Sequence, residues 1–415
     1  MHGEDTGELS EAQIAAIRRT VTSGRGALSR RSLWRAGGGA LTAAALGALA
    51  GCGIPPAGRA ETAGNAGEDH SSGEKKVVWS NWTEYIDTGE DGRSRPTLEA
   101  FGRDTGIEVT YTEDINDNVE FFGKLKPQLA AGRPTGRDLI CVTDWLAGRL
   151  IRLGWARRLD PANLPTAFAN LAAPFRTVGW DPGRAHSYPW QGVPTVIAYN
   201  LSATGGRQVT SVDQLLTDPR LKGRVALLTE MRDTVGLTLL DMGTEPESFD
   251  AEDFDAALDR LQGAVDRGQI RRFTGNDYLD DLNRGNIAAC LAWAGDLLQL
   301  QQDNPDVRYA VPDAGYLLAS DDLLVPDGAR HQANAERLID YYYRPEVAAR
   351  VAAYIGYVCP VDGVRGELAR IDPELARNPL VIPDREMTEK AHEFRLLSAA
   401  EESAFEEKFS RLIGA

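Results

Sequence analysis

The sequence predicts an α/β protein with two lobes, each built on a mostly parallel sheet flanked by helices. Strand and helix signals alternate over residues 77–153, and a second alternating series begins near residue 195. This order is typical of parallel sheets whose faces are covered by helices. The chain of 415 residues is long enough to form two separate hydrophobic cores. Because ligands of such folds usually bind between the lobes, we expect the functional site there.

The first series of elements follows from short apolar runs and from amphipathic spacing. Pro96 in a first turn and Gly106 after the last apolar residue are typical of a helix start and a helix stop. Alternation of apolar and polar residues indicates a strand, and apolar residues at helical spacing indicate a helix. The sequence thus predicts strands at 77–80, 107–111 and 138–143, and helices at 94–105, 118–131 and 145–153.

The second series repeats this alternation and then returns to the first lobe. Gly243 is typical of a helix stop. The predicted strands are 195–200, 224–229, 287–293 and 307–311, and the predicted helices are 211–217, 232–242, 254–265, 296–302, 334–343, 345–354 and 401–412. We expect residues 76–195 with 319–365 to form the first lobe, and residues 196–318 with 366–415 to form the second.

The N-terminal segment has the features of an export signal. A twin-arginine pattern at residues 30–31 precedes a weakly apolar run at 36–51, which is too short to span a membrane. The run ends in a Leu-Ala-Gly-Cys pattern at Cys52 that resembles the lipobox of bacterial lipoproteins. We expect residues 1–51 to be a signal peptide and Cys52 to carry the lipid; an amphipathic tail with a chance cysteine is the alternative. Residues 52–75 are then a flexible tether on the outer face of the membrane.

Charge and side-chain composition argue against several classes of function. The formal net charge of −16 disfavours nucleic-acid binding and favours the approach of cations, although solubility alone also explains it. The histidines are scattered and no CxxC or Cys/His cluster occurs, so we expect no metal site and no cofactor. Cys141, Cys290 and Cys359 lie in or beside apolar runs and are expected to be buried, while the sequence leaves a disulfide among them open.

The segment Asn81-Trp82-Thr83-Glu84-Tyr85 combines aromatic rings and a carboxylate at the end of the first predicted strand. An aromatic face attracts an organic cation through its quadrupole, and a carboxylate fixes the position of that cation. Packing of the two rings at the strand end is the alternative. The segment therefore indicates a binding site for an organic cation.

Together with further segments in the same order, this motif resembles the bacterial polyamine-binding proteins that serve ABC importers of spermidine and putrescine. The resemblance covers about residues 76–413. The other segments are Phe101 with Thr105-Gly106-Ile107, Asp138-Leu139, Tyr188-Pro189-Trp190-Gln191-Gly192 with Ala198-Tyr199-Asn200, Lys222-Gly223-Arg224, Met231-Arg232-Asp233, Ala292-Trp293, Asp321 before Leu323, and Ile355-Gly356-Tyr357. The resemblance implies the two-lobed type II periplasmic-binding-protein fold, with a hinge between the lobes and a ligand cleft.

The resemblance also implies a set of cleft residues. These are Trp82, Thr83, Glu84, Tyr85, Thr143, Trp145, Glu230, Asp233, Trp293, Asp321 and Tyr357. An ordinary structural role is the alternative for several of them: core packing for Trp145 and Trp293, and helix capping for Glu230 and Asp233. The spacing of three between Glu230 and Asp233 places both on one side of a helix start.

One residue departs from the family pattern. The family usually has tryptophan two residues before Asp321, where this chain has Ala319, so one end of the cleft changes. If this segment is a strand, Asp322 is expected to point to the face opposite that of Asp321. We expect a lipid-anchored, monomeric extracytoplasmic protein, without enzymatic activity, that captures a polyamine or similar organic cation for an ABC permease. Three alternatives stay open: the same fold binding an amino-acid derivative, opine or sugar-like solute, a hydrolase using two carboxylates, and a sensor or sequestering regulator.

Overall fold

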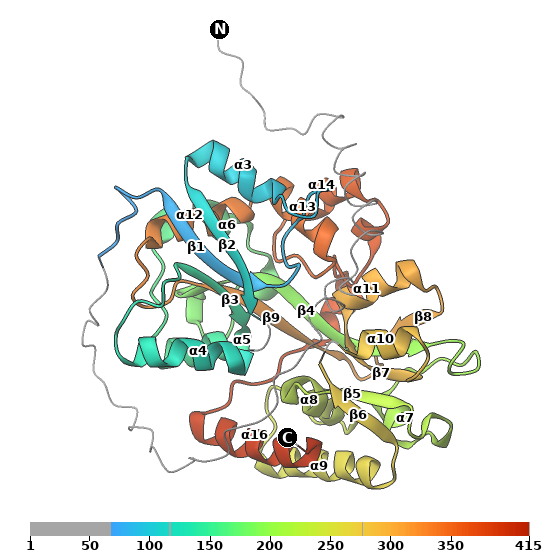
Figure 1. The fold of residues 1–415 in the computed structure, drawn as a ribbon. Helices are drawn as coiled ribbons and strands as arrows, with labels where there is room; N and C mark the ends of the chain where they lie inside the picture. Colours follow the sequence, from blue (N-terminus) through green and yellow to red (C-terminus); the bar gives the residue numbers. More distant parts are fainter. Residues whose placement is uncertain (1–67, 116–117, 276, 415) are drawn as a thin grey trace, which may run out of the picture.

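The computed structural model describes residues 68–115, 118–275 and 277–414 (Figure 1). The expected signal peptide, the expected lipidation site Cys52 and most of the expected tether lie outside these ranges. Within them, no helix is long and apolar enough to cross a membrane.

Residues 68–75, which the sequence assigned to the tether, belong to the folded body. Ser71 is buried, and its hydroxyl accepts a hydrogen bond of 3.1 Å from the backbone amide of Asn334. Asp69 accepts a hydrogen bond of 3.3 Å from the amide of Ala333. The expected end of the tether is therefore corrected. Polar contacts order this segment without large apolar side chains, which is why composition did not reveal it.

The first part of the chain forms three strands and the helices that cover them. Pro96 begins α3, and Gly106 ends it in the left-handed conformation at φ 69°, as the sequence predicts. The elements are β1 (Lys76–Trp82), α3 (Pro96–Thr105), β2 (Glu108–Ile115), α4 (Asn118–Ala130), β3 (Leu139–Thr143), α5 (Asp144–Arg152) and α6 (Pro165–Asn170). Short 3-10 segments lie at Pro161–Asn163, Ala173–Phe175 and Pro182–Arg184.

The second part begins with a long strand and continues the alternation of strands and helices. Its elements are β4 (Ser187–Asn200), α7 (Val212–Thr217), a 3-10 segment (Pro219–Leu221), β5 (Val225–Leu228), α8 (Met231–Asp241), α9 (Ala251–Asp266), β6 (Ile270–Thr274), α10 (Tyr278–Asn283), β7 (Ala289–Trp293), α11 (Ala294–Asp303), β8 (Val307–Ala310) and β9 (Tyr316–Leu324). The sequence analysis placed the start of β4 too late, because Pro189 and Pro194 argue against a strand. It also missed β6, in which Arg271 and Arg272 interrupt the apolar pattern.

The C-terminal part passes through both lobes. Its elements are α12 (Gln332–Tyr342), α13 (Pro345–Ile355), α14 (Val364–Ile371), a 3-10 segment (Leu375–Arg377), α15 (Arg385–Glu389), β10 (Ala391–His392) and α16 (Ala399–Ile413). Helix α16 begins with a capping box between Ser398 and Glu401.

One sheet runs through the whole molecule in the order β2-β1-β3-β9-β4-β7-β5-β6 (Figure 1). The outer pairs β1/β2, β1/β3, β5/β6 and β5/β7 are parallel, as the sequence predicts for each lobe. The central strands β9 and β4 are antiparallel to each other and to their neighbours β3 and β7. These two strands, here called the hinge strands, join the two lobes of the type II fold.

The two lobes have separate cores on either side of the hinge strands. The first contains Trp79 and Phe101, and the second contains Phe254 and Phe405. Residues 368–382 contribute mainly to the first core because α14 packs on α13, although the sequence assigned this stretch to the second lobe. Helix α16 lies beside α9 in the second lobe (Figure 1). The three cysteines of the described ranges are buried and free, as expected for small apolar side chains.

Candidate functional site

Both lobes line one cavity of about 770 Å³, a volume within the usual range for small-molecule sites. Every predicted cleft residue except Glu84 lines this cavity. The first lobe contributes Trp82, Thr83, Tyr85, Thr143, Trp145 and Tyr357, the second contributes Glu230, Asp233 and Trp293, and hinge strand β9 contributes Asp321. Residues from distant parts of the sequence therefore meet at one site.

Asp321 on hinge strand β9 is held by two neutral donors from the first lobe. Strand pairing places Thr143 of β3 directly opposite Asp321, and the Thr143 hydroxyl donates a hydrogen bond of 2.8 Å to it. The Tyr85 hydroxyl donates to the second carboxylate oxygen at 2.7 Å. Asp322 points to the other face of the strand, as predicted, where it forms a fully buried ion pair of 2.6 Å with Arg184.

Asp233 in the second lobe is held in a similar way. Thr195 and Trp293 are paired across β4 and β7, and both donate to Asp233 at 2.8 Å, the first through its hydroxyl and the second through its indole nitrogen. Glu230 caps α8 by accepting from the amide of Arg232, one turn before Asp233. Glu230 therefore both caps helix α8 and lines the cavity.

Burial disfavours the charged forms of both central carboxylates. It raises the pKa of Asp233 to about 7, with the charge of Glu230 adding to the rise and hydrogen bonds opposing it. Burial also raises the pKa of Asp321 to about 6, against the hydrogen bonds that it accepts. Since the donors on both groups are neutral, a cation entering the cavity would stabilise the ionised forms. The electrostatics therefore favour a positively charged ligand.

Two aromatic rings of the first lobe meet beside these carboxylates, and one of them contacts the second lobe. Tyr85 and Tyr357 meet edge to face with 5.7 Å between ring centres. The Tyr357 hydroxyl donates to Asp296 at 3.3 Å. Its ring lies so close to Gly295 that a Cβ atom there would overlap it. Glycine at position 295 therefore lets the first-lobe ring reach the second lobe.

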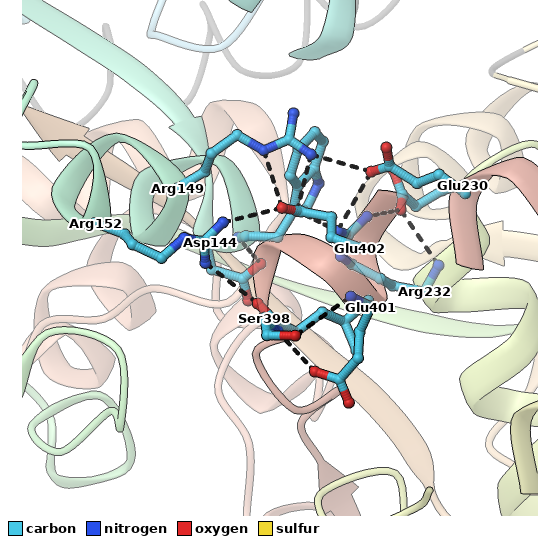
Figure 2. Close-up of polar contacts among 11 residues, drawn as sticks. Asp144, Arg149, Arg152, Glu230, Arg232, Ser398, Glu401 and Glu402 are labelled. Carbon is cyan, nitrogen blue, oxygen red and sulfur yellow. Dashed lines mark hydrogen bonds and ion pairs between the residues drawn. The ribbon is translucent and has the colours of Figure 1, made fainter. Parts of the chain in front are cut away.

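Trp145 packs against guanidinium groups of the protein itself. Its side chain is 5% exposed, and the guanidinium carbons of Arg232 and Arg149 lie 4.2 and 4.8 Å from the ring centre. Both arginines also bind Glu402 of α16 (Figure 2). Trp145 therefore has the packing role that the sequence left open, and it also lines the cavity.

Glu84 has a different environment from the rest of its motif. It adopts φ 55°, in the left-handed region, and is not among the residues lining the cavity. Burial raises the pKa of Tyr354, and the charge of Glu84 contributes to that rise. Glu84 therefore lies near Tyr354, which the strand-end motif alone did not indicate. Ala319, which stands where the resembled family usually has tryptophan, lines the cavity.

The cavity also has walls that the sequence analysis did not identify. Asp144 directly follows Thr143, so its position at a strand end was an available signal. Burial, with the charge of Asp322 adding, raises the pKa of Asp144 to about 8. Trp180, Glu393 and Arg395 also line the cavity. The sequence around them shows no regular pattern that would have indicated this position.

Among the described residues, the structure brings together a cluster of a metal-ligating type that the sequence did not suggest. Ligand atoms of Glu245, Glu247 and His392 lie within 4.8 Å of one another near the surface. Both carboxylates bind the same imidazole nitrogen, Nδ1, at 3.2 and 3.1 Å. The contacts of both carboxylates with the imidazole account for this cluster.

Comparison with known proteins agrees with the resemblance found in the sequence. The chain is 26% identical over 343 residues to the spermidine/putrescine-binding periplasmic protein of Escherichia coli, covering 83% of this chain and 93% of that protein. It is 27% identical over 323 residues to a putrescine/agmatine-binding protein of Pseudomonas aeruginosa, covering 74% and 83%.

Solved structures show the same fold. A spermidine/putrescine ABC transporter substrate-binding protein from Streptococcus pneumoniae has a TM-score of 0.69 at 22% identity, covering 82% of this chain and 98% of that one. A GABA receptor structure has a TM-score of 0.64 at 18% identity, covering 81% and 97%. The family model described as bacterial extracellular solute-binding protein matches residues 97–381. This match spans more than half of the sequence, and the chain belongs to the family of bacterial extracellular solute-binding proteins.

Proposed function

We propose that this protein captures a polyamine of the putrescine and spermidine class outside the cytoplasm and delivers it to an ABC import permease. One observation carries the proposal: Asp233 and Asp321 are buried, line the same cavity from the second lobe and the hinge, and are held only by neutral donors in the hydrogen bonds described above. Two such carboxylates beside aromatic rings match the chemistry of a flexible dication. The names of the relatives point in the same direction.

The residues suggest how such a ligand is held. Its ammonium groups would meet Asp233 and Asp321, and its methylene groups would lie against Trp82, Tyr85 and Trp293. A charge-assisted hydrogen bond contributes about 1.5–3 kcal/mol and a desolvated cation–π contact up to about 2 kcal/mol. Two or three contacts of each kind sum to as much as about 15 kcal/mol, which after ordering and desolvation costs leaves roughly the 8 kcal/mol of micromolar binding. Bending of the hinge strands would let the ligand enter and then enclose it.

Calorimetric titration of the purified protein with putrescine, spermidine and spermine tests this proposal. We expect saturable binding of at least one amine with one ligand per chain. Absence of heat for all three amines from a sample with cooperative thermal unfolding would refute the polyamine assignment. Uptake of labelled putrescine by cells lacking the protein, with and without its restoration, tests delivery to a permease.

We also infer that the protein is exported and lipid-anchored through Cys52. The inference is supported by the order of twin arginine, apolar run and small residues before the cysteine. Metabolic labelling with a fatty-acid analogue should mark the wild-type protein and place it in the membrane fraction. The Cys52→Ser variant should lose the label. A label that persists in this variant would contradict the anchor.

A second candidate function is binding of another small organic solute, such as an amino-acid derivative or opine. Ala319 in place of a family ring, and Arg395 among the lining residues, support it. Native mass spectrometry of freshly purified protein would identify a co-purifying solute. A bound amino acid or opine, with no response to amines, would favour this candidate.

A further inference from the structure

Hinge strand β9 carries two shorter strands along one of its edges. Strand β3 pairs with residues 321–324 and β10 pairs with residues 316–317, while β4 pairs with the opposite edge. Ala319 lies between the two paired stretches, and it lines the cavity. The gap between β3 and β10 therefore lies at the cavity wall, beside a small side chain.

An acidic residue borders this gap on each side. Asp144 follows the last residue of β3, and its carboxylate accepts a hydrogen bond of 3.4 Å from the backbone amide of Ser320. Glu393 follows His392, which is the last residue of β10. Both acidic side chains line the cavity. Strand pairing thus brings Asp144 and Glu393, which are far apart in the sequence, to the two sides of Ala319.

Seven acidic side chains line the cavity, and three of them already have a basic partner. Those three are Glu230, Glu247 and Glu406, each of which contacts an arginine or histidine at 3.3 Å or less. The other four have no basic side chain within ion-pair distance in the part of the chain that the structure describes; they are Asp144, Asp233, Asp321 and Glu393. The gap beside Ala319 therefore holds two carboxyl groups that are available to a cationic ligand.

Burial disfavours the charged forms of both groups at the gap. It raises the pKa of Asp144 to about 8 and also raises the pKa of Glu393. The charges of Arg232 and Arg184 oppose these two rises, but each guanidinium already binds another carboxylate, at 3.0 and 2.6 Å. A cation between Asp144 and Glu393 would stabilise their ionised forms.

Trp180 and Leu396 supply apolar surface beside Asp144. Gly148 lies one turn after Asp144 on the same face of α5. A Cβ atom at Gly148 would lie 3.1 Å from Leu396 and 3.4 Å from Trp180, so both side chains pack on this part of the helix. Both also line the cavity. A short methylene chain could therefore lie against them while the cation at its end meets Asp144.

We propose that Asp144 and Glu393 form a subsite over Ala319 for an additional ammonium group of the ligand. The inference rests on the proposed function, because it adds a third contact for the same polyamine. Asp233 and Asp321 would hold two ammonium groups, and this subsite would hold the third group of a triamine such as spermidine. One strand spacing and one residue step, about 4.8 and 3.8 Å, separate Asp321 from Asp144, so a short alkyl arm between ammonium groups suffices to reach both.

The test uses two ligands that differ by one charge. Spermidine has three amines, whereas N-propylputrescine has the same chain without the amine at the end of the propyl arm. We expect the wild-type protein to bind spermidine at least about tenfold more tightly in calorimetric titration, which corresponds to one charge-assisted hydrogen bond. Equal affinities for the two ligands would overturn the inference.

The variant that combines Asp144→Asn with Glu393→Gln removes both charges and keeps the shapes of the side chains. Asparagine retains an oxygen that can accept from the amide of Ser320, so we expect the start of α5 to be preserved. The preference for spermidine over N-propylputrescine should disappear in this variant and be reduced in each single variant. A preference that persists in the combined variant would show that the third ammonium group binds elsewhere.

Asp280→Asn is the matched control, because it removes a charge from the first turn of α10, outside the cavity. It should keep the wild-type preference. An equal loss of preference in this control would trace the effect to the overall charge of the protein and would overturn the subsite.

Ala319→Leu tests the space over Ala319 without changing any charge. The larger side chain should weaken spermidine, while putrescine should bind as it does to the wild type. Unchanged affinity for spermidine would overturn the placement of the subsite. Failure of every amine to bind the folded wild-type protein would instead refute the proposed function.

Discussion

The hydroxyl of Tyr85 donates a hydrogen bond of 2.7 Å to Asp321, a residue 236 positions later in the chain. The bond joins the loop after the first strand to a strand shared by both lobes. Burial raises the pKa of Tyr85 well above its usual value, and the charge of Asp321 adds to the rise, so the phenol remains a donor. Asp321 is therefore positioned from the first lobe while one of its faces lines the ligand cavity.

Asp321→Asn is expected to weaken putrescine binding by about 10- to 100-fold, because the variant loses one charge-assisted hydrogen bond to an ammonium group but keeps the side-chain shape. Calorimetric titration measures the loss. Asp259→Asn, the same change at an exposed position of α9, serves as the control and should bind as the wild type does. Wild-type affinity in Asp321→Asn would show that this carboxylate does not contact the ligand.

Affinity for a diamine is expected to rise with pH. The pKa values of about 7 for Asp233 and about 6 for Asp321 mean that both groups hold protons in mildly acidic solution. A bound ammonium favours the ionised forms, so binding releases protons, and affinity at pH 5 should be about 1,000-fold lower than at pH 8 where both groups must ionise. Titrations in buffers of different ionisation enthalpy measure the released protons directly. A flat profile would contradict this linkage.

The same carboxylates make the stability of the ligand-free protein fall as pH rises, whereas ligand affinity increases with pH. Their folded-state pKa values lie above the usual value of 3.8. Their contribution to stability is therefore fully present below about pH 4 and is lost as pH rises through about 6 and 7. The increase in melting temperature caused by saturating putrescine should accordingly be larger at pH 8 than at pH 5.

Gly295→Ala is expected to lower ligand affinity by displacing Tyr357. The added Cβ overlaps the tyrosine ring, which would have to leave its position in the cavity wall. A loss of about tenfold in putrescine affinity would match the loss of one aromatic contact. Gly366→Ala is the control, because it lies in helix α14 with open space around its Cβ position. Equal behaviour of the two variants in calorimetry would contradict the role of the close approach.

Glu402→Gln is expected to weaken binding of all amines by a similar factor. Glu402 does not line the cavity, but it receives arginines from both lobes and so favours the arrangement that encloses the ligand. The variant should also lower the free energy of unfolding by about 1–3 kcal/mol, because buried guanidiniums lose a charged partner. Urea unfolding and calorimetry measure the two effects.

Glu407→Gln on the same helix is the control for this change, since Glu407 is exposed and contacts Arg411 one turn away. It should leave both quantities nearly unchanged. A change in the ratio of spermidine to putrescine affinity in Glu402→Gln, without a common loss, would contradict the proposed closing role.

Local sequence patterns were sufficient to predict those helices and strands whose structure depends on one short segment. Alternation and apolar spacing predicted β1, α3 and β3, because these elements bury one face or lie wholly inside the core. The same reasoning missed most of β4 because its prolines argue against a strand. Pairing of residues 187–195 with β9 nevertheless holds Pro189 and Pro194 in extended conformation. That pairing is a long-range interaction that no local pattern reports.

By itself, the sequence determined the α/β class, the two-lobed family and ten of the residues that line the cavity, since each depends on residue type and order along the chain. Tertiary structure alone decided which groups became neighbours. Strand register placed Thr143 beside Asp321 and Thr195 beside Trp293, while helix α16 brought Glu402 to arginines of both lobes. Charge neutralisation and burial depend on these distances in space, and chain spacing carries no information about them.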